Sequence, residues 1–322
     1  MGIDVGSVST NIILMNEREE VVEKLYIRTQ GKPIKALQKG LVEIKKRLIQ
    51  SDIILGVGTT GSGRNLAGMM VGADIIKNEI TAHGVAGLKE RRDVSTIFEI
   101  GGQDSKIIIL RNGIIQDFAM NTVCAAGTGS FLDRQAARLN VPIEEFGRMA
   151  LKSKIKVRIA GRCAVFAESD MIHKQQLGHN SEDIINGLCE ALARNYLSNV
   201  GKGKEIKGPI LFQGGVAANI GIKNAFERIL NQEIIIPKHY DVMGALGAAI
   251  LAKENWEKTH RTKFYGFEIT NTNFQVKSFQ CENCPNQCEV IQFYSNGKIK
   301  GRWGDRCGKW SDIKILEENL LA

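Results

Sequence analysis

Hydrophobic positions follow two periods along the chain, one typical of strands and one typical of helices. Short apolar runs at residues 2–5, 11–15 and 21–27 alternate with turns of small and polar residues, which predicts strands joined by tight turns. From Ile34 to Leu48 the apolar residues recur every three or four positions after Pro33, which predicts a helix over residues 33–50. Residues 52–57 form an apolar run typical of a buried strand, and it leads into the loop GTTGSGR.

The first strand–turn–strand pattern recurs near residue 100. The sequence EIGGQDSK is followed by apolar residues 107–110 and by a further predicted strand at 114–120. We align Gly6 with Gly102 and Ser9 with Ser105. Such an internal duplication predicts two similar α/β halves, residues 1–95 and 96–242, with residues 243–257 packing back on the first half. If the halves face one another, both turns line one phosphate-binding cleft.

Further elements complete this α/β pattern. Residues 80–88, 129–139, 142–152 and 181–200 have helical periodicity, and residues 209–212 and 233–236 are short apolar strands. The motif QGGVAAN is a glycine turn that opens a helix, and residues 244–252 form a helix of small residues. From about residue 261 aromatic and β-branched residues alternate, which predicts strands at 264–269 and 274–279 and a hairpin at 289–303. Residues 261–322 are therefore predicted to be a small β-rich extension.

Composition narrows the possible functions. The 322 residues are 43% hydrophobic and carry a net charge of +8, but the basic residues are spread out and no aromatic-interleaved basic stripe occurs. No run of eighteen apolar residues occurs, and the first residues read as a strand and a turn instead of a signal peptide. We expect a cytoplasmic protein that binds neither nucleic acid nor membranes.

Seven cysteines form an odd, unevenly clustered set, which favours metal or redox chemistry in a reducing cytoplasm over disulfides. Cys124 and Cys163 each stand alone before a predicted helix. Helix N-termini carry free N–H donors that favour an anion or a thiolate-bound cluster, although a buried cysteine beside a tight turn is the plain alternative. We expect Cys189, on the apolar side of its helix, to be a core residue.

The extension contains four cysteines at a spacing typical of metal sites. A C-x2-C-x3-C run is followed by one further cysteine after the predicted hairpin, which could bring it back beside the others. This spacing predicts a zinc or iron–sulfur site, and four reduced structural thiols are the alternative. The four residues are Cys281, Cys284, Cys288 and Cys307.

Five motifs in order carry a family resemblance: DVGSVST, GGQDSK, NTVCAAGTGSFLD, GRCAVFAES and QGGVAANIG. Over residues 1–256 the chain resembles the ATP-dependent activators of 2-hydroxyacyl-CoA dehydratases and the related ATPase subunits of benzoyl-CoA reductases. The resemblance implies a duplicated actin/sugar-kinase/Hsp70-type ATPase fold. It also implies a homodimer that shares one [4Fe-4S] cluster on its two-fold axis, with Cys124 and Cys163 as ligands from each protomer.

The implied activity is ATP hydrolysis with Mg²⁺, coupled to electron transfer. A ferredoxin- or flavodoxin-like donor would reduce the cluster, and the electron would pass to an iron–sulfur acceptor enzyme: a 2-hydroxyacyl-CoA dehydratase, a benzoyl-CoA reductase or a double-cubane-cluster protein. Asp104 or Gln103 would position the attacking water, Asp4 and Asp104 would act through Mg²⁺, and Glu79 is a weaker candidate. The predicted ATP/ADP contacts are Gly6, Ser7, Ser9, Thr10, Gly102, Gln103, Lys106, Gly214, Gly215 and Asn219.

Two other functions remain open from the sequence. A sugar or acyl kinase of the same fold would leave Cys124 and Cys163 without a purpose. A nucleotide-sensing module with a structural zinc tail would need those cysteines only for packing. The extension departs from the short activators and resembles an extension of longer relatives, so it leaves open both the number of clusters per dimer and the partner enzyme.

Overall fold

The computed structural model describes residues 1–50, 52–121 and 123–311, and it divides into two compact units. The first unit comprises Met1–Glu79 and Gly244–Ala322, and the second comprises Ile80–Met243. No helix in the described parts of the chain is long and apolar enough to span a membrane. Each unit has its own five-stranded sheet and its own hydrophobic core.

The first sheet has the strand order β3-β2-β1-β4-β5. Its strands are β1 (Gly2–Val5), β2 (Ser9–Met15), β3 (Val21–Arg28), β4 (Gly58–Thr60) and β5 (Ile75–Ile76). The first three form an antiparallel meander, and β4 and β5 extend the sheet in parallel. The helices of this unit are α1 (Pro33–Arg47), α2 (Arg64–Val71) and α9 (Met243–Thr259).

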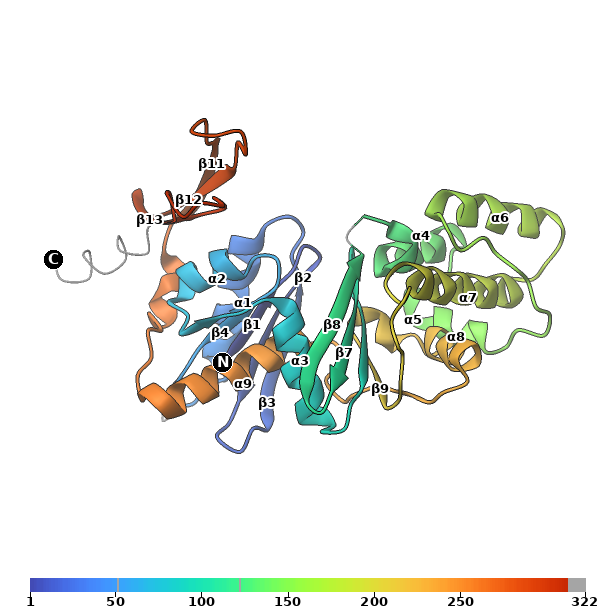
Figure 1. Ribbon diagram of the computed structural model, residues 1–322, viewed down its shortest axis with the longest axis horizontal. Helices are drawn as coiled ribbons and strands as arrows, with labels where there is room; N and C mark the ends of the chain where they lie inside the picture. Colours follow the sequence, from blue (N-terminus) through green and yellow to red (C-terminus); the bar gives the residue numbers. More distant parts are fainter. Residues whose placement is uncertain (51, 122, 312–322) are drawn as a thin grey trace. The chain divides into compact units, whose positions relative to one another are not determined.

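Two glycines let α9 lie directly against the first sheet (Figure 1). A Cβ atom at Gly2 would collide with the carbonyl of Ala245, and one at Gly58 would collide with the carbonyl of Ala248. The small residues of α9, which the sequence showed as GALGAAILA, thus pack backbone to backbone on β1 and β4. The C-terminal helix is therefore an integral layer of the first unit.

The second sheet repeats this order as β10-β9-β6-β7-β8. Its strands are β6 (Thr96–Ile100), β7 (Ser105–Arg111), β8 (Ile114–Asn121), β9 (Ile210–Gln213) and β10 (Ile234–Ile235). Its helices are α3 (Glu79–Glu90), α4 (Gly129–Arg138), α5 (Ile143–Ala150), α6 (Ala164–Gln176), α7 (Ser181–Asn199) and α8 (Ile220–Leu230). At its core Phe98, Tyr196 and Phe226 touch one another with ring centroids 5.0–5.3 Å apart. Burial of each such ring contributes about 1.5–3 kcal/mol.

The two sheets confirm the predicted α/β duplication but correct its alignment by one residue. Val5 pairs with Thr10 across the first turn, and Ile100 pairs with Ser105 across the second. The same backbone hydrogen bond closes both turns, from Gly6 N to Ser9 O (2.8 Å) and from Gly101 N to Asp104 O (3.0 Å). Gly6 therefore corresponds to Gly101, and the predicted match with Gly102 is wrong. Two adjacent glycines made both alignments possible from sequence, and only the strand pairing separates them.

Two predicted strands are wrong. Residues 52–57 are not a strand, because pairing with β1 begins only at Gly58, opposite Gly2. At Val57, the residue before β4, the backbone N–H donates to the Asp74 carboxylate at 2.8 Å instead of to a neighbouring strand. Residues 264–269 are not a strand either: Phe267–Asn271 form the 3₁₀ helix η3, and the Phe264 ring packs edge-on against it. The aromatic alternation there serves a turn that packs on the first unit's core.

The extension contains the predicted hairpin as part of a three-stranded antiparallel sheet, β11 (Phe274–Gln280), β12 (Glu289–Ser295) and β13 (Lys298–Trp303). Phe293 is fully buried and stacks on Phe274, and a Cβ at Gly301 would meet the Met69 side chain of α2. The extension is thus grouped with the first unit. Residues 312–322 of the predicted extension lie outside the described residues, and the predicted boundaries at 95, 242 and 261 stay predictions.

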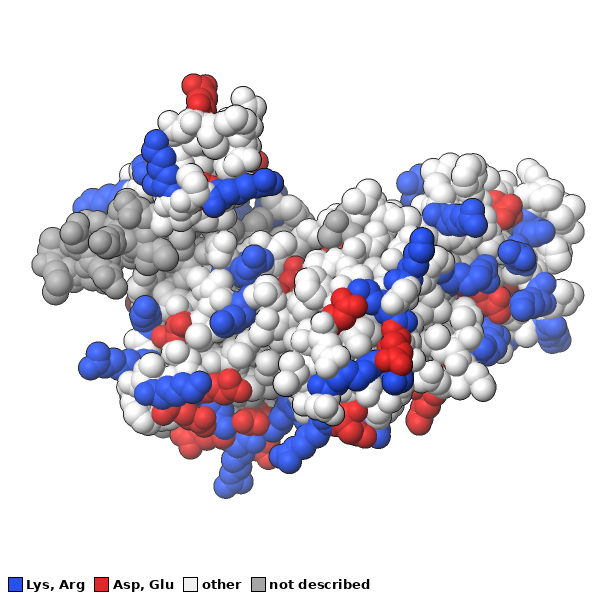
Figure 2. Space-filling view, in the orientation of Figure 1, with Lys and Arg blue, Asp and Glu red and all other residues white. Residues whose placement is uncertain are grey.

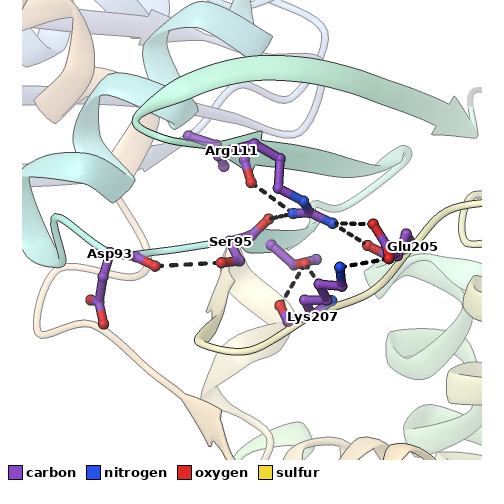
Figure 3. Close-up of polar contacts among 7 residues, drawn as sticks. Asp93, Ser95, Arg111, Glu205 and Lys207 are labelled. Atoms are coloured by element: carbon purple, nitrogen blue, oxygen red, sulfur yellow. Dashed lines mark hydrogen bonds and ion pairs between the residues drawn. The ribbon is translucent and has the colours of Figure 1, made fainter.

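One end of the second sheet is held by a polar network around Arg111 (Figure 3). Its guanidinium donates to the carbonyls of Ser95 (3.0 Å) and Glu205 (2.8 Å), and Lys207 forms an ion pair with Glu205. The loop between α7 and β9 is thereby tied to the end of β7 and to the residue before β6. On the face shown in Figure 2, basic and acidic side chains are interspersed and form no continuous basic stripe.

Candidate functional site

The turn between β1 and β2 is a compact, backbone-rich loop. Ser7 is exposed and Ser9 is half-buried, so both remain accessible. Thr10 is fully buried, and its hydroxyl lies 3.0 Å from the hydroxyl of Thr29, which also donates to Gly6 O. Thr10 therefore supports the buried side of the turn through Thr29, while Gly6, Ser7 and Ser9 form its more accessible part. Such a loop offers N–H and hydroxyl donors of the kind that bind phosphate.

A row of three polar side chains crosses the first sheet beside this turn. Asp4 of β1 pairs with Asn11 of β2 and with Thr60 of β4, so the three lie side by side. The Asn11 Oδ1 and Thr60 Oγ1 atoms are buried and have no hydrogen-bond partner among the described residues. Buried polar atoms normally have partners, and carboxylate, amide and hydroxyl oxygens suit a hard cation such as Mg²⁺. The row is a candidate site for the cation of a bound nucleotide.

The second sheet carries an equivalent row with different charges. Glu99 of β6 pairs with Lys106 of β7 and with Gln213 of β9. The Lys106 ammonium is 2.8 Å from Glu99 Oε2 and 2.9 Å from Asp104 Oδ2, and its side chain is 2% exposed. Burial raises the pKa of Glu99, while the nearby Lys106 opposes that shift. The sequence analysis did not select Glu99, although its place one residue before the second turn matches that of Asp4.

The third residue of each row is followed by a position that only glycine can occupy. Gly61 has φ +90° and Gly214 has φ +87°. A Cβ at Gly61 would collide with Asp4 Oδ1 and Val5 O, and one at Gly214 would collide with Ile100 O. These glycines keep the acid of each row close to the neighbouring loop.

The remaining nucleotide candidates lie around the second turn and β9. Gln103 is exposed and Asp104 is half-buried, so the turn presents both. Gly215 begins the 3₁₀ helix η2 (Gly215–Ala218), and Asn219 caps α8 by accepting the N–H of Ile222 at 3.1 Å. The buried Nδ2 of Asn219 has no hydrogen-bond partner among the described residues. Glu79 is half-buried at the start of α3.

Cys124 and Cys163 belong to neighbouring loops of the second unit. Cys163 directly precedes α6, as predicted, but Cys124 precedes only the short 3₁₀ helix η1 (Ala125–Gly127), and α4 begins later, at Gly129. Both cysteines therefore precede a helical segment, and the helix predicted from residue 129 begins there as α4. The Cys124 Sγ lies 4.0 Å from the carbonyl of Arg162, the residue before Cys163, so the two loops adjoin.

Asn195 of α7 joins these two loops. Its Nδ2 lies 3.8 Å from Cys124 Sγ and donates to Gly161 O at 2.6 Å, and the residue is 3% exposed. Asn121 holds the same loop from its other side, because its amide accepts from Cys124 N and donates to Cys124 O. Sequence reasoning missed Asn195, whose only signal was a polar residue on the buried side of an amphipathic helix.

The surroundings of the two cysteines are apolar and exposed. Val123 is 95% exposed, Val165 67% and Phe166 65%. Large apolar side chains seldom gather on a free surface, so this patch is typical of an interface. In residues 1–50, 52–121 and 123–311, no group of three or more His, Cys, Asp or Glu side chains is arranged to hold a metal ion. One chain thus brings two thiols to this surface.

The other cysteines differ in setting. Cys189 is a core residue, as predicted, and burial raises the pKa of its thiol to about 12. In the extension Cys281 is buried and its N–H donates to Cys288 O at 2.8 Å, whereas Cys284 and Cys307 are exposed. The structure therefore brings Cys281 and Cys288 together directly.

The two duplicated sheets, each with a tight glycine turn after its first strand, are those of an ATPase of the actin/sugar-kinase fold, as predicted. The chain belongs to the BadF/BadG/BcrA/BcrD ATPase family, whose model matches residues 1–252. It is 34% identical to the (R)-2-hydroxyglutaryl-CoA dehydratase activating ATPase of Acidaminococcus fermentans, over 78% of this chain and 96% of that protein. It is 27% identical to a component of the benzoyl-CoA reductase of Thauera aromatica, over 81% of this chain and 95% of that protein.

A solved structure shares this fold. The activator of 2-hydroxyisocaproyl-CoA dehydratase from Clostridium difficile, determined with bound ADPNP, superimposes with a TM-score of 0.72 at 34% identity. The match covers 80% of this chain and 96% of that one. The match to the family model ends at residue 252, before the extension.

Proposed function

We propose that this protein is an ATP-hydrolysing iron–sulfur protein that delivers a low-potential electron to a partner iron–sulfur enzyme. The named relatives activate 2-hydroxyacyl-CoA dehydratases or belong to a benzoyl-CoA reductase, which supports this class of partner. The reducing donor would be a ferredoxin- or flavodoxin-like protein, and the site of action the cytoplasm.

In this proposal the two turns hold the nucleotide phosphates. Gly6, Ser7 and Ser9 supply donors from the first turn, and Gly102 and Gln103 from the second. The oxygen row of Asp4 holds Mg²⁺ or its waters, and Asp104 or Gln103 orients the attacking water. Lys106 would offset the negative charge of the phosphates, and it also forms an ion pair with Asp104 of the same turn. Gly214, Gly215 and Asn219 contact the adenosine.

The cluster would be shared by a homodimer. The donor set fits a [4Fe-4S] group, which takes four thiolates: each chain offers Cys124 and Cys163 in adjoining loops within an exposed apolar patch. When bound, such a cluster supplies one-electron chemistry. The apolar side chains of Val123 and Phe166 would be covered in the dimer, and Asn195 would hold both ligand loops in register.

One observation supports coupling between the nucleotide and the cluster. The carbonyls of Gly101 and Gly102, in the second turn, accept the N–H groups of Gly129 (2.9 Å) and Ser130 (2.8 Å) at the start of α4. The segment from Cys124 to α4 is continuous with those residues. A movement of the turn on ATP binding or hydrolysis would therefore be transmitted to the Cys124 loop through two backbone hydrogen bonds.

The test uses protein purified without oxygen. We expect about four irons and four sulfides per dimer from the Cys124–Cys163 site, and loss of both in Cys124→Ser, which should still bind ATP. Cys189→Ser is the matched control, because Cys189 lies in the core. An intact cluster in Cys124→Ser, or a monomeric iron-free wild-type protein, would overturn the proposal.

Coupling has its own readout. Gly129→Ala places a Cβ about 3.0 Å from Gly101 O and so presses on this junction, while it leaves every residue proposed to contact the nucleotide or the cluster unsubstituted. We expect the wild-type cluster to change its EPR signal or its rate of iron loss to a chelator when ADP is replaced by an ATP analogue. That nucleotide-dependent difference should shrink in Gly129→Ala.

A further inference from the structure

The four cysteines of the extension all lie at one end of its three-stranded sheet. Cys281 directly follows β11 and Cys288 directly precedes β12. Because Gln280 pairs with Glu289, these two cysteines form the next position of the ladder, and the Cys281 N–H donates to Cys288 O at 2.8 Å. Cys284 lies within the short loop that they close. Three of the four sulfurs thus belong to one closed loop.

The path of the chain after β13 brings Cys307 back to this same end. Trp303, the last residue of β13, lies near the start of β12, where it pairs with Ile291. Gly304 then adopts φ +107°, and a Cβ there would collide with the carbonyl of Glu289. The chain therefore turns across the first residue of β12, which is the neighbour of Cys288. Cys307 follows this turn by three residues.

The sulfur of Cys281 is surrounded by hydrogen-bond donors. Trp310 Nε1 lies 3.2 Å from it and Asn283 Nδ2 lies 3.3 Å from it. The Trp310 indole is held in place by an edge-on contact with Phe279 at 5.0 Å, and its backbone N–H donates to Asp305 at 2.8 Å. Donors oriented on a cysteine sulfur are typical of thiolates that bind metals, where they offset the negative charge.

We propose that Cys281, Cys284, Cys288 and Cys307 together bind one zinc ion. The backbone bond between Cys281 and Cys288 holds two of the ligands close enough for a single ion, at Zn–S distances of about 2.3 Å. In the described residues the four sulfurs are not gathered as a metal site, so zinc binding requires the exposed Cys284 and Cys307 to turn inward beside Cys281 and Cys288. A zinc ion with four thiolates carries a net charge of about −2, which Lys309 and Arg302, both near the Trp310 ring, offset.

Such a site has a physical purpose in this small sheet. Most side chains of β11 are exposed, and the buried Phe293 and Val290 lie on β12. A sheet with so few buried residues gains little stability from its own core, and a closed four-thiolate site would add a crosslink that stabilises it. The ion is structural because all four of its positions are occupied by protein, which leaves none open for a substrate.

The experiment measures bound metal in the full-length protein after expression with added zinc and gel filtration. We expect one zinc per chain in the wild type, in Cys189→Ser and in Cys124→Ser. We expect none in Cys281→Ser and Cys307→Ser. Cobalt substitution should give the visible bands of a tetrahedral four-thiolate site in the wild type and not in Cys307→Ser, while ATP binding by that variant reports that the chain is folded.

The role of Trp310 is tested separately. Trp310→Phe keeps the ring contact but removes the N–H donor, so the zinc should remain bound and be released to a chelator roughly 10–100-fold faster. Zinc retained by Cys281→Ser and Cys307→Ser would overturn the proposal. Iron and sulfide in the extension of Cys124→Ser would overturn it in favour of a second cluster. Because Cys124 and Cys163 are not ligands here, this proposal and the bridging cluster can fail independently.

Discussion

The two polar rows of the duplicated sheets have the same backbone geometry but different charges. Asp4, Asn11 and Thr60 form the first row, and Glu99, Lys106 and Gln213 form the second. Both begin with an acid one residue before the last position of a strand, and both adjoin a glycine with φ near +90°. The cross-strand partner of the acid is a neutral amide in the first row and a lysine in the second.

This difference indicates how the duplicated halves have divided their roles. In the second row the buried lysine forms ion pairs with Glu99 and Asp104, which stabilises the turn that contacts α4. In the first row buried oxygens of Asn11 and Thr60 stand beside Asp4 with no hydrogen-bond partner among the described residues. The first row is thus suited to binding a metal cation, whereas the second row already contains a cation, the Lys106 ammonium. The comparison makes four predictions.

The largest effect is expected from Lys106→Met. It removes the positive charge and leaves Glu99 buried without its main partner, which should cost about 3–5 kcal/mol of unfolding free energy. The equivalent change in the first row, Asn11→Leu, should cost far less, because Asn11 is neutral and its loss leaves no buried charge without an ion-pair partner. Chemical denaturation measures both. Equal losses at the two positions would show that the rows are electrostatically alike.

The shared backbone geometry is tested by Gly61→Ala and Gly214→Ala. Each adds a Cβ that collides with a backbone carbonyl at positive φ, so each should lose about 1–3 kcal/mol through overpacking, with similar values in the two halves. Gly113→Ala is the control, since Gly113 has φ +75° but nothing within 4 Å of its added Cβ. It should lose only about 1 kcal/mol. Thermal or denaturant unfolding distinguishes the three.

The division of roles predicts different kinetic effects of removing each acid. Asp4→Asn should lower kcat for ATP hydrolysis by about 100-fold, because the carboxylate no longer holds the cation that stabilises transition-state charge. Its unfolding free energy should change little. Glu99→Gln should lower kcat less than Asp4→Asn. A larger kinetic loss in Glu99→Gln would assign the cation to the second row.

The smallest effect is a pH dependence that arises from Glu99 in the second row. Burial raises the pKa of Glu99 above its usual value of 4.5, so the folded state holds that proton more tightly than the unfolded chain. The contribution is fully present below pH 4.5 and is lost as the pH rises through the folded pKa, with a slope of at most about 1.4 kcal/mol per pH unit. Glu99→Gln should remove this slope when unfolding is measured from pH 4.5 upward. An unchanged slope would assign the pH dependence to other groups.

Local patterns were enough to predict most of the fold. Alternation and helical spacing placed most strands and helices, because each element must bury one face, but they did not predict β4, α2 or β5. They failed at residues 52–57 and 264–269, where an apolar run had no strand beside it to pair with. They also placed each of the two cysteine motifs ahead of a helix in the second half, but could not find Asn195, because a polar residue on a buried helix face has meaning only through the loops it contacts.

The sequence by itself determined the duplication, the glycine-rich turns, the two isolated cysteines and the four clustered ones, because these are properties of residue type and spacing. Only the tertiary structure decided that Gly6 corresponds to Gly101, that Lys106 lies between Glu99 and Asp104, and that the second turn bonds to the start of α4. Those features depend on which strands pair and in which register. Register is settled by burying side chains from distant parts of the chain together, and a local pattern does not contain that information.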